Sequence, residues 1–287
     1  MKRIVPFIAF IFYSTIASSQ IITPPLSQRQ TVEQKVGYTE VKIEYCRPHM
    51  RGRQIFGGLE TYGEVWRTGA NRNTQISFNE GITVEGKSLP AGTYTLFTRP
   101  DTATWKVYLY PYDNGYGVPD DFSEDKAHII LTVPVFELNR KFENLTINLE
   151  NATDNSADIA IIWESSYIAV PIKFSTHEKI LSDIDDIVND HSGDYYSAAK
   201  YYLSSGQDLE KAKHFIEQSI KLRERPGGDP QFWIFQLKAE ILFANNENKA
   251  ALTTAKKAMD MASSRGPEDM YVLQIASLIE SIENSTD

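Results

Sequence analysis

The hydrophobic pattern of the chain changes its period just after Phe174, and this change constrains the fold more than any other feature. From about Gln30 to Phe174, short alternating or apolar runs are rich in Ile, Val, Thr, Tyr and Trp and are separated by Gly, Pro, Asn and Asp. Beyond Phe174, apolar residues recur three and four positions apart, which is the period of a helix. The sequence therefore predicts a mixed, two-domain fold: an all-β sandwich or jelly-roll-like domain at 25–174, followed by an all-α domain of helical hairpins at 176–287.

The first domain is expected to contain about eight to ten strands, because no helical pattern intervenes between the short runs. Glu85-Gly86, between an Ile82-Thr83-Val84 run and Lys87, is typical of a hairpin turn. The other predicted strands are 41–45, 75–78, 93–98, 105–110, 127–133, 145–149, 158–163 and 167–174.

The second domain is expected to contain six helices in antiparallel pairs, with Thr176 and Asp208 as N-caps. The helical patterns cover 176–190, 208–223, 231–244, 248–262 and about 268–282. The small and large residues of these helices resemble, in their spacing, those of a tetratricopeptide repeat. The residues that carry the resemblance are Leu203, Ala212, Ile216, Ala239, Leu242, Ala251, Ala255 and Ala258. The resemblance implies a groove for a protein partner; a purely structural appendage is the alternative.

The first residues are typical of an export signal. A basic start, Met1-Lys2-Arg3, precedes an apolar run from Ile4 to Ile16 and the small residues Ala17-Ser18-Ser19. The run is shorter than the roughly 20 residues that a spanning helix needs, which favours a signal peptide at 1–19 over a short membrane anchor. We therefore expect an exported protein, periplasmic or secreted, without a membrane span after cleavage.

Charge and cysteine content narrow the possible functions. The formal net charge of −9 argues against a nucleic-acid-binding protein, which would need a positive face. Cys46 is the only cysteine, so neither an intrachain disulfide nor a thiolate metal site can form, and we expect it to be a small core residue. The five histidines lack metal-ligand spacing, and no nucleophile elbow, P-loop or dinucleotide fingerprint is present. No cofactor or metal is expected, and nothing in the sequence requires an enzyme.

An arginine block forms the first candidate site in this acidic chain. It comprises Arg47, Arg51, Arg53, Arg67 and Arg72. Guanidinium groups pair bidentately with carboxylate or phosphate, so the block predicts an anion-binding patch. Asn71 could add amide contacts and Trp66 a stacking surface. The alternative is structural, with Arg51 and Arg67 buried against Glu44, Glu64 or Glu164.

The loop from Tyr110 to Asp125 is the second candidate site, because aromatic and acidic residues alternate along it. Tyr112, Asp113 and Tyr116 are its candidate ligand-binding residues, since aromatic platforms beside carboxylates suit sugar rings. Paired carboxylates such as Asp113, Asp120 and Asp121 could also hydrolyse a glycan if they lay across a cleft. The simplest alternative is a mobile, solvated loop.

Several motifs in the first domain occur together and in order. They are QTVEQ at 30–34, YxRP at 45–48, RGRxIFGGL at 51–59, YGxVWRTGAN at 62–71, LPAGTY at 89–94, WE at 163–164 and VPI at 170–172. Together they resemble the bacterial, mostly exported family called domain of unknown function 2911, over about residues 25–174. The family has no established activity to carry over, and the helical third lies outside the resemblance.

The leading hypothesis is a non-catalytic binding or scaffold protein of a bacterial envelope. Its β-domain would bind an anionic small molecule or glycan, and its helices would bind a protein partner. A carboxylate-dependent glycan hydrolase and a purely structural protein are the two alternatives.

Overall fold

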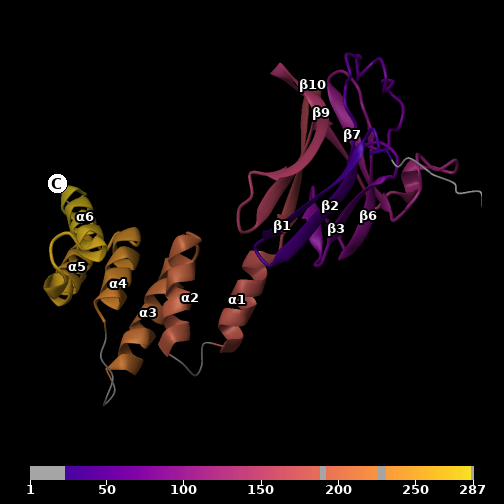
Figure 1. Cartoon of the computed structure of the whole chain (residues 1–287). Helices are drawn as coiled ribbons and strands as arrows, with labels where there is room; N and C mark the ends of the chain where they lie inside the picture. Colours follow the sequence, from indigo (N-terminus) through magenta and orange to yellow (C-terminus); the bar gives the residue numbers. More distant parts are fainter. Residues whose placement is uncertain (1–22, 188–191, 225–230, 286–287) are drawn as a thin grey trace, which may run out of the picture. The chain divides into compact units, whose positions relative to one another are not determined.

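The computed structural model describes residues 23–187, 192–224 and 231–285, and in it the chain divides into two compact units after Thr176. The first unit consists of strands and the second of helices (Figure 1). The mixed two-part fold predicted from the change of period is therefore confirmed.

Two antiparallel sheets form the first unit. The larger sheet has the order β1-β2-β3-β6-β7-β8 and the smaller has the order β5-β4-β10-β9. The strands are β1 (Gln28–Val36), β2 (Thr39–Arg47), β3 (Thr74–Phe78), β4 (Ile82–Val84), β5 (Lys87–Leu89), β6 (Gly92–Arg99), β7 (Thr104–Pro111), β8 (Ile129–Pro134), β9 (Phe136–Glu150) and β10 (Ser156–Phe174). A short 3-10 helix, η1 (Glu124–Lys126), precedes β8.

One hydrophobic core joins the two sheets. The larger sheet contributes buried residues such as Ile43, Ile76 and Leu109, and the smaller sheet contributes Ile147 and Ile161. Alternate residues of each strand face inward, as in β2, where every second residue from Thr39 to Tyr45 is buried. Burial of apolar area from both faces is what holds the sheets together as a sandwich.

Three strands differ substantially from the sequence prediction. β9 begins at Phe136, nine residues before the start of the predicted strand at 145–149. β1 was not among the predicted strands, because its side chains are mostly polar; it lies at a sheet edge and pairs with β2 from Gln28 opposite Arg47 to Val36 opposite Thr39. β10 was predicted as two strands and is one, bent by register shifts around Glu164, which has a φ of 52°. The hairpin predicted at Glu85-Gly86 is confirmed, joining β4 to β5.

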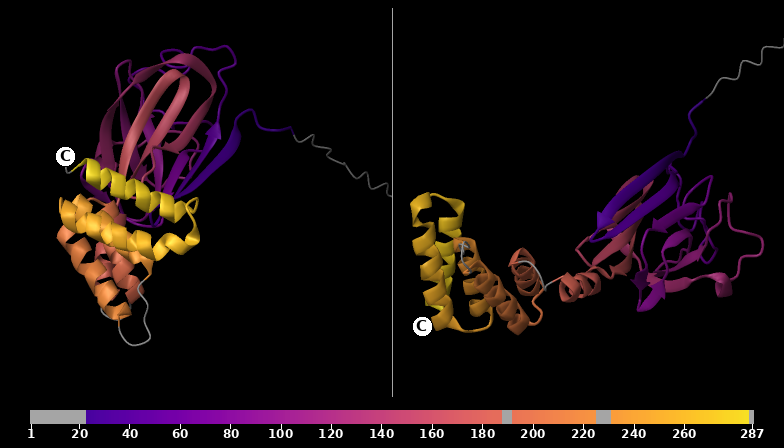
Figure 2. Two further views of the ribbon diagram at one scale, coloured as in Figure 1. Left: turned by 90° about the vertical axis from the view of Figure 1, so that its left-hand side faces the viewer. Right: turned by 90° about the horizontal axis from the view of Figure 1, so that it is seen from below.

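The second unit contains the helices α1 (Thr176–Ile187), α2 (Ser192–Ser204), α3 (Leu209–Arg223), α4 (Phe232–Ala244), α5 (Asn248–Ala262) and α6 (Met270–Asn284), with a 3-10 turn η2 (Ser263–Arg265). Helices α2 to α6 lie side by side in chain order (Figures 1 and 2). Short turns join α2 to α3 and α4 to α5, and fully buried alanines such as Ala212, Ala251 and Ala255 allow close packing.

Asp208 caps α3 as predicted, since its side chain accepts a hydrogen bond from the Lys211 amide at 3.1 Å. Thr176 does not act as predicted: it is the first residue of α1, and its buried Oγ1 has no hydrogen-bond partner among the described residues. None of the helices in the described ranges combines the length and apolarity that crossing a bilayer requires.

Candidate anion-binding site

The predicted arginines lie mostly in the connection between β2 and β3, residues 48–73, which we call the arginine loop. Backbone hydrogen bonds fix this loop to β6 and its end. The Trp66 amide donates to the Thr98 carbonyl at 2.7 Å, the Thr98 amide donates back to Trp66 at 3.0 Å, and the Gly63 amide donates to Pro100 at 2.9 Å. The backbone on either side of Trp66 is thus held against β6 by these hydrogen bonds.

Trp66 is buried rather than exposed, so the stacking surface predicted for it is wrong. Only 5% of it is accessible, and its indole stacks on Trp163 with ring centroids 5.8 Å apart. Phe56 and Trp105 pack edge-on against the same ring, and the indole Nε1 donates to the Gly69 carbonyl at 3.2 Å. A large aromatic side chain is stabilised more by burial than a small one, because it removes more apolar area from water. Burial of Trp66 therefore holds the arginine loop in place.

The backbone next to Trp66 adopts an unfavourable conformation. Thr68 has a φ of 54°, which is unusual for a β-branched residue, and Asn71 has a φ of 55°. Thr68 is held there by a hydrogen bond between its Oγ1 and that of Thr98 at 3.0 Å, and by the Thr74 hydroxyl, which donates to its carbonyl at 2.8 Å. Such strain persists where the surroundings enforce it, and it is found disproportionately at binding sites.

Arg47 has a structural role between the two sheets. It extends from β2 toward β9, where Nε donates to the Leu145 carbonyl at 2.8 Å and Nη2 donates to Thr146 Oγ1 at 2.9 Å. Nη1 donates to Gln30 Oε1 at 3.2 Å. Of the predicted site residues, Arg47 is therefore the one most fully used by the fold.

Arg51 and Arg53 bond to main-chain carbonyls near them. Arg51 Nη2 donates to Leu26 at 3.3 Å. Arg53 Nε donates to Met50 at 2.9 Å and its Nη2 to His49 at 2.7 Å, which leaves Nη1 without a protein acceptor among the described residues. Both side chains keep hydrogen-bond donors for a further acceptor.

Arg67 and Asn71 lie together at the far end of the loop. Arg67 Nη1 donates to the Asn71 carbonyl at 2.9 Å, and Asn71 Nδ2 donates to the Ser27 carbonyl at 3.2 Å. The Arg67 guanidinium is half-buried, and within the described ranges its other N–H groups form no hydrogen bond to the protein. A bidentate acceptor could use these donors.

None of the five guanidinium groups of the arginine block forms an ion pair with a carboxylate in the part of the chain that the structure describes. Their bonds all go to neutral oxygens. In a chain with more acidic than basic residues, the charges of these five arginines are thus not neutralised by a carboxylate in direct contact among the described residues.

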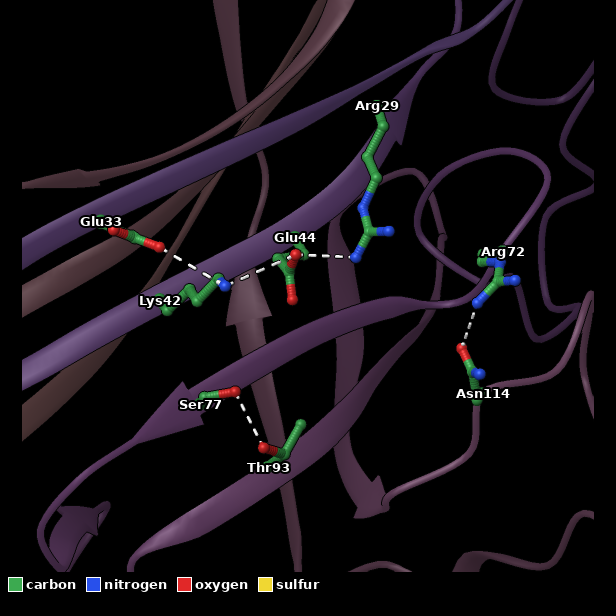
Figure 3. A network of polar contacts seen from close by, with 8 residues as sticks. All are labelled: Arg29, Glu33, Lys42, Glu44, Arg72, Ser77, Thr93 and Asn114. Carbon is green, nitrogen blue, oxygen red and sulfur yellow. Dashed lines mark hydrogen bonds and ion pairs between the residues drawn. The ribbon is translucent and has the colours of Figure 1, made fainter.

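The carboxylates that the structural alternative assigned to Arg51 and Arg67 have other partners. Glu44 pairs with Arg29 at 2.7 Å and with Lys42 at 3.6 Å on the outer face of the larger sheet (Figure 3). The nearly buried Glu164 accepts from Lys141 Nζ at 3.0 Å and from the Ile55 amide at 3.1 Å. Glu64 forms no ion pair among the described residues. The predicted burial of the two arginines against these acids is therefore wrong.

Glu60 is the site residue that sequence reasoning missed. Burial raises the pKa of its carboxyl from 4.5 to about 7, and the charges of Arg67 and Arg53 partly oppose this rise. The side chain is half-buried and accepts no hydrogen bond from the described residues. A carboxyl whose pKa is raised by burial and influenced by two nearby cations is a candidate functional residue. The sequence feature that could have indicated Glu60 is its position directly after the RGRxIFGGL motif.

A tight glycine turn positions Glu60. Its amide donates to the Ile55 carbonyl at 2.9 Å, and its carbonyl accepts from the Gly57 amide at 2.9 Å. Gly57 has a φ of 75°, and a β-carbon there would lie 2.6 Å from Cε2 of Tyr62. Only glycine fits this conformation and this close approach. The Tyr62 ring therefore lies directly against the turn that carries Glu60.

The second candidate loop, residues 110–125, which we call the aromatic loop, is attached to the arginine loop through Asn73, a second residue that sequence reasoning missed. Asn73 is buried, and its Nδ2 donates to Asp113 Oδ2 at 3.0 Å while its Oδ1 accepts from the Gly117 amide at 2.9 Å. Asp113 also accepts from the Gly115 amide at 2.9 Å. The Asp113 carboxylate is thus used to shape the loop, whereas Tyr112 and Tyr116 are exposed.

Arg72 brings the two predicted sites together. Its Nε donates to the Tyr116 hydroxyl at 3.1 Å. Its Nη1 donates to Asn114 Oδ1 at 2.9 Å, as Figure 3 shows. The guanidinium carbon lies 5.5 Å from the centre of the Tyr116 ring. Gly117 lies beside Arg67, since a β-carbon at Gly117 would be 3.9 Å from Arg67 Nη1. Arg67 and Arg72 therefore lie next to the Tyr116–Gly117 part of the aromatic loop.

Two of the acids at the end of the aromatic loop, Asp121 and Glu124, have local partners. Glu124 accepts from the Tyr108 hydroxyl at 2.8 Å and pairs with Arg99 and Lys106; the tyrosine hydrogen bond, more than the cations, lowers the pKa of its carboxyl. Asp121 pairs with Lys126, which lowers the pKa of Asp121. These contacts fasten the loop to β6 and β7.

A family model described as "Protein of unknown function (DUF2911)" matches residues 27–172, about half of the chain. Comparison with curated proteins and with solved structures gave no match. The match covers the β-sandwich with the arginine loop, Glu60 and the aromatic loop. The chain belongs to this family of proteins of unknown function.

Proposed function

We propose that the protein is a non-catalytic binding protein whose β-domain binds an anionic small molecule or glycan at the arginine loop. The observation that carries the proposal is the group formed by Arg53, Glu60 and Arg67. Two guanidinium groups with unused donors lie near a carboxyl that is partly protonated at neutral pH, so the group carries net positive charge. A carboxylate or phosphate would supply the acceptors that these donors lack.

The contacts of two of the three candidate catalytic acids favour binding over hydrolysis. Asp113 supports the backbone of its own loop, and Asp121 is paired with Lys126. A glycosidase needs one carboxyl free to protonate the leaving group and a second one across the cleft. The alternative of a purely structural protein predicts that no anion binds at all, which the experiment below addresses.

The test is thermal unfolding of the purified protein and its Arg67→Ala variant with acetate, inorganic phosphate and acidic sugars. A ligand of the native state raises the melting temperature by mass action. We expect at least one of these anions to stabilise the wild type, and its effect to be lost in Arg67→Ala, whose own melting temperature without ligand stays within a few degrees.

Arg140→Ala is the matched control. Like Arg67, Arg140 has no carboxylate partner among the described residues; unlike the half-buried Arg67, it is exposed and lies on β9 over the Phe142 ring. This variant should respond to anions as the wild type does. Equal responses of wild type and Arg67→Ala to every anion, or no response of either, would contradict the proposal.

A groove in the second unit favours a further function for the helices. It has a volume of about 300 Å³ and is lined by α2, α4 and α6. Each helix contributes an aromatic residue and, one turn later, a long polar residue. The pairs are Tyr196 and Lys200, Trp233 and Gln236, and Tyr271 and Gln274.

We propose that this groove binds an extended peptide segment of a protein partner. The row of aromatic residues would contact apolar side chains of the peptide, while Gln236 and Gln274 could bond to its backbone N–H and C=O groups. Lys200 has no ion pair within the described ranges and would favour an acidic residue in the peptide. Loss of peptide binding on substitution of Trp233 is the test.

We further propose that the protein is exported, periplasmic or secreted, and functions in a bacterial envelope. The support is the pattern of residues 1–19, which lie outside the described residues.

A further inference from the structure

The carboxyl of Glu60 is the part of the site that a simple anion would not use. It is near enough to Arg53 and Arg67 for their charges to lower its pKa, yet it forms an ion pair with neither. In the described part of the protein no group donates a hydrogen bond to it. A half-buried carboxyl without a donor is unfavourable, because burial removes water without supplying a substitute. A ligand that complements all three groups must therefore carry both an anionic group and a hydrogen-bond donor.

The Tyr62 ring adds an apolar surface beside Glu60. It lies against Gly57 in the turn that carries Glu60, and 39% of the residue is exposed. An aromatic ring of this kind packs against the C–H face of a sugar while polar neighbours bind its hydroxyl groups.

We propose that the surface formed by Arg53, Glu60, Tyr62 and Arg67 binds an acidic sugar of the hexuronate class. The sugar carboxylate is held by the two guanidinium groups, a ring hydroxyl donates to Glu60, and the sugar ring lies on Tyr62. This inference rests on the proposed anion-binding function and assigns its ligand class.

The same groups discriminate against other anions. Acetate can occupy the arginines but has no hydrogen-bond donor for Glu60. Phosphate carries an O–H donor at neutral pH but has no apolar C–H face to lie on the Tyr62 ring. A neutral sugar can satisfy Glu60 but leaves the guanidinium donors without an anion. A hexuronate combines a carboxylate, adjacent hydroxyl donors and a ring with an apolar C–H face, which are the three features that the arginines, Glu60 and Tyr62 complement.

The experiment compares galacturonate with galactose, acetate and phosphate by titration calorimetry or by NMR titration of the full mature protein. We expect galacturonate to bind at least tenfold more tightly than acetate, and galactose not to bind measurably. In Glu60→Gln, which is nearly isosteric, the galacturonate-to-acetate ratio should fall about tenfold, as expected when a hydrogen bond to a charged acceptor is lost. Acetate should bind as well or better, because a negative charge has been removed.

Two further variants complete the test. Tyr62→Leu should lower the affinity for galacturonate about threefold or more and leave the affinity for acetate unchanged. Glu64→Gln is the matched control, since Glu64 is an exposed glutamate of the same loop, and it should behave as the wild type. A trimer of galacturonate distinguishes the source of the ligand: tighter binding of the trimer indicates a polysaccharide, and equal binding indicates the free acid.

Equal affinities for galacturonate and acetate in the wild type, or an unchanged ratio in Glu60→Gln, would overturn the inference while the anion site itself stands. Binding of galactose as tight as that of galacturonate would also overturn it. If no anion binds in an Arg67-dependent manner, the proposed function fails and the inference fails with it.

Discussion

At the residue scale, Glu60 changes the interpretation of the arginine block. The block predicted an anion-binding patch of five arginines, but their contacts separate them. Arg47 is used between the sheets, Arg72 holds the aromatic loop, and Arg53 and Arg67 act on Glu60. A cluster of arginines in sequence thus becomes, in space, a small site with a titratable carboxyl.

Glu60 also predicts how stability depends on pH. Because its folded-state pKa is raised from 4.5 to about 7, the folded protein favours the protonated form. The stability associated with this group is fully present below about pH 4.5 and is lost as the pH rises through 7. Glu60→Gln should therefore be more stable than wild type at pH 8, by on the order of 1–2 kcal/mol after allowance for partial exposure, and the difference should shrink below pH 5.

The measurement is urea unfolding of wild type, Glu60→Gln and Glu64→Gln between pH 4.5 and 8.5. The Glu64 variant should show no such trend. A Glu60 variant whose stability relative to wild type does not change with pH would mean that the carboxyl titrates at its ordinary value and is not desolvated.

At the element scale, most strands and helices follow from local patterns. Alternation located the inner strands of both sheets, and helical spacing located α3 to α6 within a few residues. β1 was missed because an edge strand with polar side chains lacks the apolar alternation of inner strands. The two strands predicted within β10 could not be recognised as one strand from the sequence, because the bulge at Glu164 interrupts the alternation of buried and exposed residues.

The helices also carry a prediction at this scale, because the proposed peptide groove is a property of α2, α4 and α6 together. The probe is the peptide that binds most tightly in an array of extended acidic and apolar sequences. Trp233→Ala removes the middle of the aromatic row and should lower the affinity for this peptide about tenfold or more. Fluorescence anisotropy of the labelled peptide measures this effect.

Lys257→Ala is the control for the groove, since Lys257 lies on α5 over the Phe235 ring and does not line the groove. Its affinity for the peptide should equal that of wild type. Equal weakening by both substitutions would indicate a general loss of helix packing and would argue against a groove-bound peptide.

At the scale of the whole molecule, the two units have separate hydrophobic cores. One core lies between the sheets and includes Trp105 and Trp163, while the helices have cores of their own around Ile216 and Ala255. The family match covers only the sandwich. The β-domain function and the helical function are therefore separate proposals, and each can fail without the other.

Export is the remaining prediction at this scale. If residues 1–19 are a signal peptide, the mature protein should begin at Gln20. Mass spectrometry of the protein recovered from its native cells measures this start. A mature chain that retains residues 1–19 would contradict cleavage and would favour the membrane-anchor alternative.

The fold class was determined by the sequence alone, because periodicity, turn residues and the Asp208 cap are local properties of the chain. The hairpin at Glu85-Gly86 and the family membership indicated by the order of the motifs were also determined by the sequence. The candidate site was decided by tertiary structure. Desolvation of Glu60, burial of Trp66 and attachment of Asp113 to Asn73 depend on distances between residues that are far apart or oriented by packing. Burial and through-space charge, which set pKa values and the availability of donors, exist only after the chain has folded.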